Sequence, residues 1–201
     1  MDGLVMCGGR GTRLEDDGDK PLFEVGDRPM IASVLSALEG SKVESMYAVT
    51  SPHTPATRQY VLEESARSDV SVIDGSGGGY VEDLAAALET VSPPVLTVAA
   101  DLPLLEASLL DRLLEIYDEM APDGDRSLTV CVPTSLKEVL GTSQDTTLEQ
   151  QGRSVTPAGV NVVGRSEEEC RYVSHDVRLA VNVNRPEDGE LAAQLLCNSH
   201  S

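Results

Sequence analysis

A glycine-rich segment near the N-terminus has the composition of a phosphate-binding loop. Its sequence is Cys7-Gly8-Gly9-Arg10-Gly11-Thr12-Arg13-Leu14, and Lys20-Pro21-Leu22 follows shortly after it. Glycines let backbone N–H groups approach and wrap an anion, while Arg13 and Lys20 add positive charge where a triphosphate would lie. The spacing excludes both a Walker A loop and a dinucleotide-binding fingerprint. The segment therefore predicts a nucleoside triphosphate site, with a flexible surface turn as the alternative.

The segments around this loop have the pattern of a parallel sheet with covering helices. Residues 3–7 form a short apolar run that opens onto the glycine-rich turn, as a buried first strand would. Further apolar runs alternate with amphipathic stretches along the chain. We therefore expect an α/β fold in three layers, with a doubly wound, mostly parallel, Rossmann-like sheet. Its strands are expected at residues 3–7, 43–50, 70–73, 95–100, 128–132, 158–163 and 179–183.

Proline and glycine positions predict where helices begin and end. Pro29, Thr54-Pro55 and Pro186 suit the first turn of a helix, and Gly40 suits the end of one. The polar stretch 141–154 is expected to be a surface loop. The chain shows no internal repeat and no linker, so we expect a single domain over residues 1–201.

The composition is strongly acidic. The chain has 34 Asp and Glu against 15 Lys and Arg, which gives a formal net charge of −19. This charge argues against nucleic-acid binding through a basic surface. Hydrophobic residues still make up 40% of the chain, which is enough for a packed core, whereas aromatic residues make up only 3%. We interpret the composition as that of a protein from a salt-adapted cytoplasm, with an ordinary acidic protein as the alternative.

The cysteines and the apolar runs exclude other classes of protein. The four cysteines form neither a CxxC pair nor a Cys/His metal-binding spacing, so no zinc site or redox motif is expected. No apolar run approaches the ~20 residues that a membrane-spanning helix needs, and the N-terminus lacks the pattern of a signal peptide. We therefore expect a cytoplasmic protein without membrane insertion.

Several segments resemble a known enzyme superfamily. The run Gly8 to Arg13, followed by Lys20-Pro21, resembles the signature of the GT-A-type nucleotidyltransferases, which include sugar-phosphate nucleotidylyltransferases and molybdopterin guanylyltransferases. Residues 50–55, 77–84 and 157–163 are similar, more narrowly, to the archaeal adenosylcobinamide-phosphate guanylyltransferases. The resemblance extends from Met1 to about Leu196. It implies a nucleotidyltransferase domain with a nucleotide-binding half at 1–134 and an acceptor side at 155–201.

The resemblance also implies a role for each residue of the glycine-rich loop. In the superfamily the loop holds the phosphates, an arginine contacts the departing pyrophosphate, and a lysine neutralises charge near the α-phosphate. Such cations are needed because two anions meet when a phosphate attacks a phosphate. The nucleotide-binding residues of this segment are then Gly8, Gly9, Arg10, Gly11, Thr12, Arg13 and Lys20, and Arg13 and Lys20 are also catalytic.

Asp101 is the candidate metal ligand, and it is also expected to be catalytic and to contact the nucleotide. It follows the apolar run 95–100, from which a carboxylate can project beyond the sheet into a ligand crevice, and it resembles the metal-binding aspartate of the superfamily. Hard oxygen ligands and substrate phosphates favour Mg²⁺ over zinc or copper. The resemblance places a second metal ligand, an asparagine, just before the last helix. Asn184 matches this position better than Asn182, which would be a strand-end or capping residue. A turn or helix N-terminal aspartate is the alternative for Asp101.

The remaining site residues are expected from the resemblance alone. It places Ser51, Gly77 and Gly79 in contact with the nucleotide, and it places Gly159 and Asn161 where the acceptor meets the nucleotide. The competing interpretation for Gly77 and Gly79 is that these glycines only permit a tight turn. For Gly159 and Asn161 it is a packed strand with one close backbone approach.

The resemblance implies a specific reaction. GMP would pass from GTP to adenosylcobinamide phosphate, giving adenosylcobinamide-GDP and pyrophosphate in cobalamin biosynthesis, and the related enzymes suggest a homodimer. Two alternatives remain. One is transfer to another phosphate acceptor, such as molybdopterin, a phospholactate or a sugar phosphate. The other is a non-catalytic nucleotide-binding regulator, against which the joint presence of Arg13, Lys20 and Asp101 argues.

The net charge predicts that salt stabilises the fold. Repulsion among surface carboxylates weakens as the screening length falls from about 10 Å at about 0.1 M salt to about 3 Å at about 1 M. The urea midpoint of unfolding should therefore rise as KCl is raised over this range. A midpoint that is constant or falls would contradict the salt-adapted interpretation.

Overall fold

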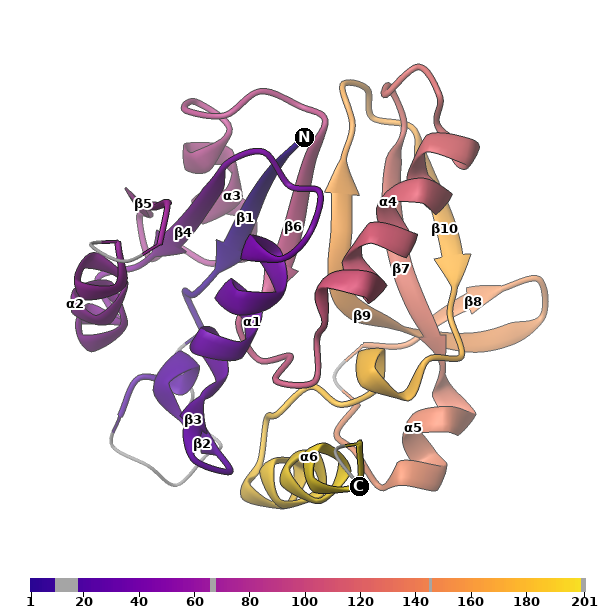
Figure 1. Cartoon of the computed structure of the whole chain (residues 1–201). Coiled ribbons are helices and arrows are strands. Elements are labelled where there is room, and N and C mark those ends of the chain that lie inside the picture. Colours follow the sequence, from indigo (N-terminus) through magenta and orange to yellow (C-terminus); the bar gives the residue numbers. More distant parts are fainter. Residues whose placement is uncertain (10–17, 66–67, 145, 200–201) are drawn as a thin grey trace.

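A mixed, mostly parallel sheet forms the centre of the molecule, and helices cover both of its faces (Figure 1). The computed structural model describes residues 1–9, 18–65, 68–144 and 146–199. Within them the main sheet has eight strands in the order β10-β7-β9-β6-β1-β4-β5, with β8 paired to β9. Strand β9 runs antiparallel to β6, β7 and β8. The strands are β1 (Asp2–Met6), β4 (Met46–Thr50), β5 (Val70–Asp74), β6 (Val95–Ala99), β7 (Ser127–Pro133), β8 (Leu148–Gln150), β9 (Arg153–Val163) and β10 (Glu169–Val173).

The helices enclose the sheet and a small hairpin. A two-stranded antiparallel sheet of β2 (Glu24–Val25) and β3 (Arg28–Pro29) precedes the first α-helix. The α-helices are α1 (Met30–Glu39), α2 (Pro55–Glu64), α3 (Tyr80–Ala87), α4 (Ala107–Met120), α5 (Thr134–Leu140) and α6 (Pro186–Ser199), and the short 3-10 helices are η1 (Lys20–Leu22) and η2 (Val177–Leu179). None of these described helices combines the length and the apolar composition needed to cross a membrane.

Strand β1 explains why helices lie on both faces. Its side chains alternate, because successive residues of a strand point to opposite faces. Val5 packs in the core that α1 and α4 form with the sheet, while Leu4 and Met6 pack with Ala87 of α3. A strand that is apolar on both faces must be covered twice, as parallel sheets generally are. The predicted fold class is confirmed.

The order of the strands locates the binding crevice. The chain passes from β1 to β4 and β5 on one side and then crosses to β6 on the other side of β1. Ligands of such sheets bind at the carboxyl ends of the strands where the direction of winding changes. Here that place lies beyond the ends of β1 and β6, where Cys7 and Asp101 follow their strands.

A small apolar cluster brings the two ends of the chain to this edge. Val25 and Met30 from the N-terminal part pack with Val183 and with Ala192 of α6. Figure 1 shows α6 beside β2 and β3, beyond the carboxyl ends of the sheet. The segment before α6 is thereby held next to the loop that carries Lys20.

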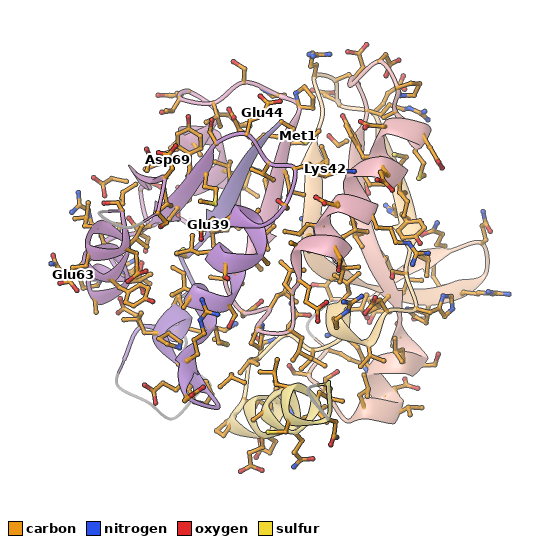
Figure 2. The ribbon with its side chains drawn as sticks, in the orientation of Figure 1. Met1, Glu39, Lys42, Glu44, Glu63 and Asp69 are labelled. Carbon is orange, nitrogen blue, oxygen red and sulfur yellow. The ribbon has the colours of Figure 1, made fainter. Side chains whose placement is uncertain are left out.

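Most of the described acidic residues lie on the surface, as the composition predicts, although Asp83 and Asp188 are buried. Figure 2 labels Glu39, Glu44, Glu63 and Asp69 on the half that contains β4, β5 and α2, and all four side chains are exposed. Glu44 also accepts a hydrogen bond from the Met1 ammonium at 2.7 Å, at the end of the sheet away from α6.

The predicted helix starts at Pro29, Thr54-Pro55 and Pro186 are confirmed within one residue, since α1, α2 and α6 begin at these positions. Proline is tolerated there because the first N–H groups of a helix have no partner inside the helix. Gly40 ends α1 as expected. The strand predicted at 43–50 is β4, which begins at Met46, three residues later than predicted.

The strand predicted at 179–183 is wrong. Leu179 belongs to η2, and the next residues are buried but pair with no strand. Side chains satisfy this backbone instead, because the carbonyl oxygen of Ala180 accepts from Thr142 Oγ1 at 2.9 Å and from Lys137 Nζ at 3.1 Å. Burial produced the apolar pattern, and the pattern alone does not distinguish a strand from an irregular buried segment.

The loop predicted at 141–154 is wrong in part. It contains β8 and the start of β9, which pair with each other. Besides the short elements η1, η2, β2 and β3, the helix α5 and the strand β10 were also missed. Both are short and half-exposed, so their hydrophobic periodicity is weak. Gly141, which ends α5 at a φ of 73°, is the residue that could have indicated a helix end there.

Replacing a core leucine should destabilise the fold. Leu110 of α4 is fully buried in the core shared by α1, α4 and the sheet. Leu110→Ala should lower the free energy of unfolding by about 2–5 kcal/mol, measured by urea denaturation, because it removes apolar contacts and leaves a cavity. Val139→Ala is the matched control, because Val139 is 84% exposed and its loss should change the free energy by less than about 0.5 kcal/mol.

Candidate active site

Lys20 is positioned by the start of a helix. The carboxylate of the preceding residue, Asp19, accepts a hydrogen bond from the backbone N–H of Thr57 in the first turn of α2, at 2.6 Å. Such a carboxylate is stabilised by the free N–H groups and the dipole of the helix start. The stem of Lys20 then passes over the glycine-rich loop, since a β-carbon added to Gly9 would lie 3.8 Å from Lys20 Cδ.

Three segments distant in sequence meet at the Lys20 ammonium. Lys20 Nζ donates to Asp101 Oδ2 and to Asn184 Oδ1, each at 2.5 Å. The Lys20 and Asp101 side chains are only 15% and 17% exposed, so their attraction is screened less than that of a surface pair. The backbone N–H of Val183 donates to the Asp101 carbonyl at 3.0 Å, which ties the C-terminal segment to the end of β6.

The Asp101 and Asn184 oxygens fit a hard divalent cation. Both already face one positive charge, and carboxylate and amide oxygens are ligands that Mg²⁺ accepts. Within the described ranges, no group of three or more His, Cys, Asp or Glu side chains could form a metal centre without a substrate. This agrees with a cation that takes its remaining ligands from water and substrate phosphates, as Mg²⁺ commonly does.

A buried carboxylate fixes the Asn184 side chain. Asp188, in the first turn of α6, is 3% exposed and accepts from Ser143 Oγ at 2.9 Å and from the Asn184 backbone N–H at 3.0 Å. Ser143 Oγ in turn accepts from Asn184 Nδ2 at 3.1 Å. With its amide nitrogen held there, Asn184 presents its oxygen to Lys20.

A cavity of about 320 Å³ lies beside these residues. Its lining joins the end of β1, the Lys20 loop, the start of α3 and the end of β6, and includes Gly8, Gly9, Lys20, Gly79, Tyr80, Asp83 and Asp101. The cavity is open to solvent and lies at the expected crevice, so Lys20 and Asp101 can be reached along it.

Asp83 joins the two glycine-rich loops of the cavity. Its carboxylate accepts from the Gly77 backbone N–H at 2.8 Å and from Ser76 Oγ at 3.2 Å. A β-carbon on Gly8 would lie 2.8 Å from Asp83 Oδ2, so the first loop requires glycine there for close approach. No local pattern in the sequence indicates the contact of Asp83 with residue 8.

The structure brings some of the predicted residues together and leaves others apart. Gly8, Gly9, Lys20, Gly79 and Asp101 line one cavity. Ser51 and Gly77 are not among its lining residues. Ser51 accepts from the His53 N–H in the turn after β4, and a β-carbon on Gly77, at a φ of 77°, would touch Pro52. The predictions for Arg10, Gly11, Thr12 and Arg13 fall outside the described residues.

The two predicted acceptor residues lie on β9. A β-carbon on Gly159, whose φ is 83°, would come within 3.1 Å of Ala99 Cβ and of Asn182 Nδ2. Gly159 is therefore close to the end of β6 and to Asp101. Asn161 lies two residues farther along β9, opposite Thr97 of β6.

Comparison with known proteins identifies the family of this chain. The model of the MobA-like NTP transferase domain matches residues 3–157. The chain belongs to the MobA-like NTP transferase family. It is also 35% identical to the adenosylcobinamide-phosphate guanylyltransferase of Methanocaldococcus jannaschii, over 98% of this chain and 97% of that protein. The resemblance identified from the sequence is confirmed.

Solved structures support the fold of this NTP transferase. A Bacillus anthracis protein assigned as a glucose-1-phosphate thymidylyltransferase superposes with a TM-score of 0.72 at 12% identity, covering 97% of this chain and 94% of that one. A CMP:2-keto-3-deoxy-manno-octonic acid synthetase complexed with CTP gives a TM-score of 0.67 at 14% identity, covering 98% of both chains. At these identities the likeness concerns the fold.

Cys7 of this NTP transferase lines the cavity but is not a nucleophile. Its side chain is fully buried, and this burial raises the pKa of the Cys7 thiol to about 12. The Cys7 thiol is therefore protonated at pH 8, whereas the thiolate is the reactive form.

Cysteine alkylation at pH 8 should therefore spare Cys7 in the folded protein. Cys197, which is exposed, is the internal control and should react with iodoacetamide first. Peptide mass spectrometry of the labelled protein measures both sites. Labelling of Cys7 at the rate of Cys197 under native conditions would contradict this description of Cys7.

Proposed function

We propose that this NTP transferase moves GMP from GTP to the phosphate of adenosylcobinamide phosphate and releases pyrophosphate. The observation that carries the proposal is the similarity to the Methanocaldococcus jannaschii guanylyltransferase over almost the whole of both chains. The geometry supplies the chemistry, because Lys20, Asp101 and Asn184 meet beside a glycine-lined cavity at the carboxyl edge of the sheet.

The reaction needs no nucleophile from the protein. A phosphate oxygen of the acceptor is already ionised at neutral pH and attacks the α-phosphorus of GTP in line. The new P–O bond forms as the bond from the α-phosphorus to the oxygen bridging to the β-phosphorus breaks, and pyrophosphate carries away the electron pair. The enzyme's contribution is to position two anions and to neutralise the charge that develops.

Each proposed residue has one task in this reaction. Lys20 neutralises charge at the α-phosphate, and Arg13 contacts the departing pyrophosphate. Asp101 and Asn184 would hold Mg²⁺, which supplies positive charge close to the phosphates. The proposed nucleotide-binding residues are Gly8, Gly9, Arg10, Gly11, Thr12, Arg13, Lys20, Ser51, Gly77, Gly79 and Asp101.

The acceptor is proposed to bind on the β9 side. Gly159 supports this placement, because its backbone lies against Asn182 beside the end of β6 and leaves no room for a side chain. Asn161 completes the proposed acceptor contacts. Residues 1–134 would thus bind the nucleotide and residues 155–201 the acceptor, in a cytoplasmic enzyme that acts as a homodimer.

A substrate panel tests the proposed function. The purified protein is incubated in high salt with Mg²⁺, each of the four common ribonucleoside triphosphates and adenosylcobinamide phosphate, and both pyrophosphate and the corrinoid product are measured. Turnover is expected with GTP and with none of the other three triphosphates. Pyrophosphate release that depends on a different phosphate acceptor, or on none, would contradict the proposed substrate.

Removing the Asp101 carboxylate should abolish transfer without unfolding the protein. Asp101→Ala leaves Lys20 without its carboxylate partner and the cation without its acidic ligand, so turnover should fall by at least about a thousandfold. Asp118→Asn, at an exposed position on α4, is the control and should retain full activity. Steady-state pyrophosphate release and urea unfolding curves measure the two effects, and wild-type activity in Asp101→Ala would remove Asp101 from the mechanism.

A further inference from the structure

A buried lysine lies behind the candidate metal site. Lys137 of α5 is 1% exposed, and its ammonium donates to the backbone oxygens of Ser143 and Ala180, at 3.3 and 3.1 Å, and to Asn182 Oδ1 at 3.1 Å. A buried ammonium is costly unless its hydrogen bonds are made. Two of these partners are backbone groups, but the third belongs to a side chain that reaches the site.

Asn182 links this lysine to Asp101. Its amide nitrogen donates to Asp101 Oδ1 at 3.1 Å and to the Ala158 carbonyl at 3.3 Å. Because an ammonium only donates, the Asn182 atom that faces Lys137 must be the oxygen. The NH₂ group must then face Asp101, whose ionised carboxylate only accepts. Lys137 and Asp101 therefore demand the same orientation of the Asn182 amide.

The two oxygens of Asp101 are assigned to different partners as a result. Oδ1 accepts from Asn182, and Oδ2 accepts from Lys20. A hydrogen bond on Oδ1 fixes the plane of the carboxylate and turns Oδ2 toward the Asn184 oxygen, which shares the same ammonium. Groups that hydrogen-bond to a metal ligand tune metal affinity in this way.

We propose that Lys137 is a positioning residue that acts through Asn182 to hold the Asp101 carboxylate in the orientation that binds the divalent cation. This inference rests on the metal-binding role of Asp101 in the proposed function. Lys137 itself does not touch the substrate. Without its ammonium, the Asn182 amide can turn its oxygen toward Asp101, which would place two acceptors against each other and displace the carboxylate.

A purely structural role for Lys137 is the competing explanation, because Lys137 also holds the buried segment after η2. The chain offers a matched control for this. Thr142 Oγ1 donates to the same Ala180 oxygen at 2.9 Å, and Thr142 is also buried. Thr142→Val removes that anchor with little change of shape and leaves the link from Lys137 to Asn182 in place.

The test measures cation binding directly. Mn²⁺ replaces Mg²⁺, and its affinity for the protein bound to a non-hydrolysable GTP analogue is measured by electron paramagnetic resonance, with no acceptor present. Lys137→Met should weaken Mn²⁺ binding about 10- to 100-fold. Thr142→Val should change it less than about twofold. Urea unfolding confirms that each variant is folded.

A second variant covers the case in which Lys137→Met does not fold. Asn182→Ala breaks the same link and leaves Lys137 its two backbone acceptors, so it should weaken Mn²⁺ binding to a similar degree. If both single variants fold, the double variant should bind no more weakly than either, because both changes break one link.

Three results would overturn the inference. The first is an unchanged Mn²⁺ affinity in Asn182→Ala or in folded Lys137→Met. The second is a loss of Mn²⁺ affinity in Thr142→Val as large as that in Lys137→Met. The third is a double variant in which the losses of the two single variants add fully. Failure of the wild-type protein to bind the nucleotide and Mn²⁺ together would instead reject the proposed function on which the inference depends. Binding of both without corrinoid transfer would reject only the proposed acceptor.

Discussion

The organisation of the site depends on the charge of one carboxylate at the end of a buried strand. Asp101 leaves β6 at the carboxyl edge of the sheet, and its two oxygens accept from Lys20 and Asn182. Lys20 is the first residue of η1 and Asn182 lies in the segment before α6, while Lys137 of α5 donates to Asn182. Segments from both halves of the chain thus converge on a single, largely buried carboxylate.

This arrangement places cations where an acidic protein needs them. The net charge of −19 repels a triphosphate at long range, and concentrated salt screens that repulsion. At the site, Lys20 and Lys137, two of only fifteen basic residues outside histidine, lie within one hydrogen-bonded network around Asp101. The surface charge therefore governs stability and solubility, while local cations govern the chemistry.

The sequence predicts the parts of the site whose signals are local. The glycines at the end of β1 and Asp101 at the end of β6 follow apolar runs, so the strand order of an α/β sheet was enough to bring them together. Resemblance selected Asn184. Lys137, Ser143 and Asp188 were not predicted, because their roles come from hydrogen bonds that close across 41 to 45 residues and leave no periodic pattern. The same reason explains the false strand at 179–183, where side chains rather than a neighbouring strand satisfy the backbone.

A crystal structure with Mg²⁺ and a non-hydrolysable GTP analogue tests the central claim most directly. The account predicts a metal ion about 2.1 Å from an Asp101 oxygen and from Asn184 Oδ1, with the Lys20 ammonium moved from these oxygens to the α-phosphate. Asn182 should still donate to Asp101 Oδ1. A metal ion bound away from Asp101, or a triphosphate bound away from the Gly8 and Gly9 loop, would contradict it.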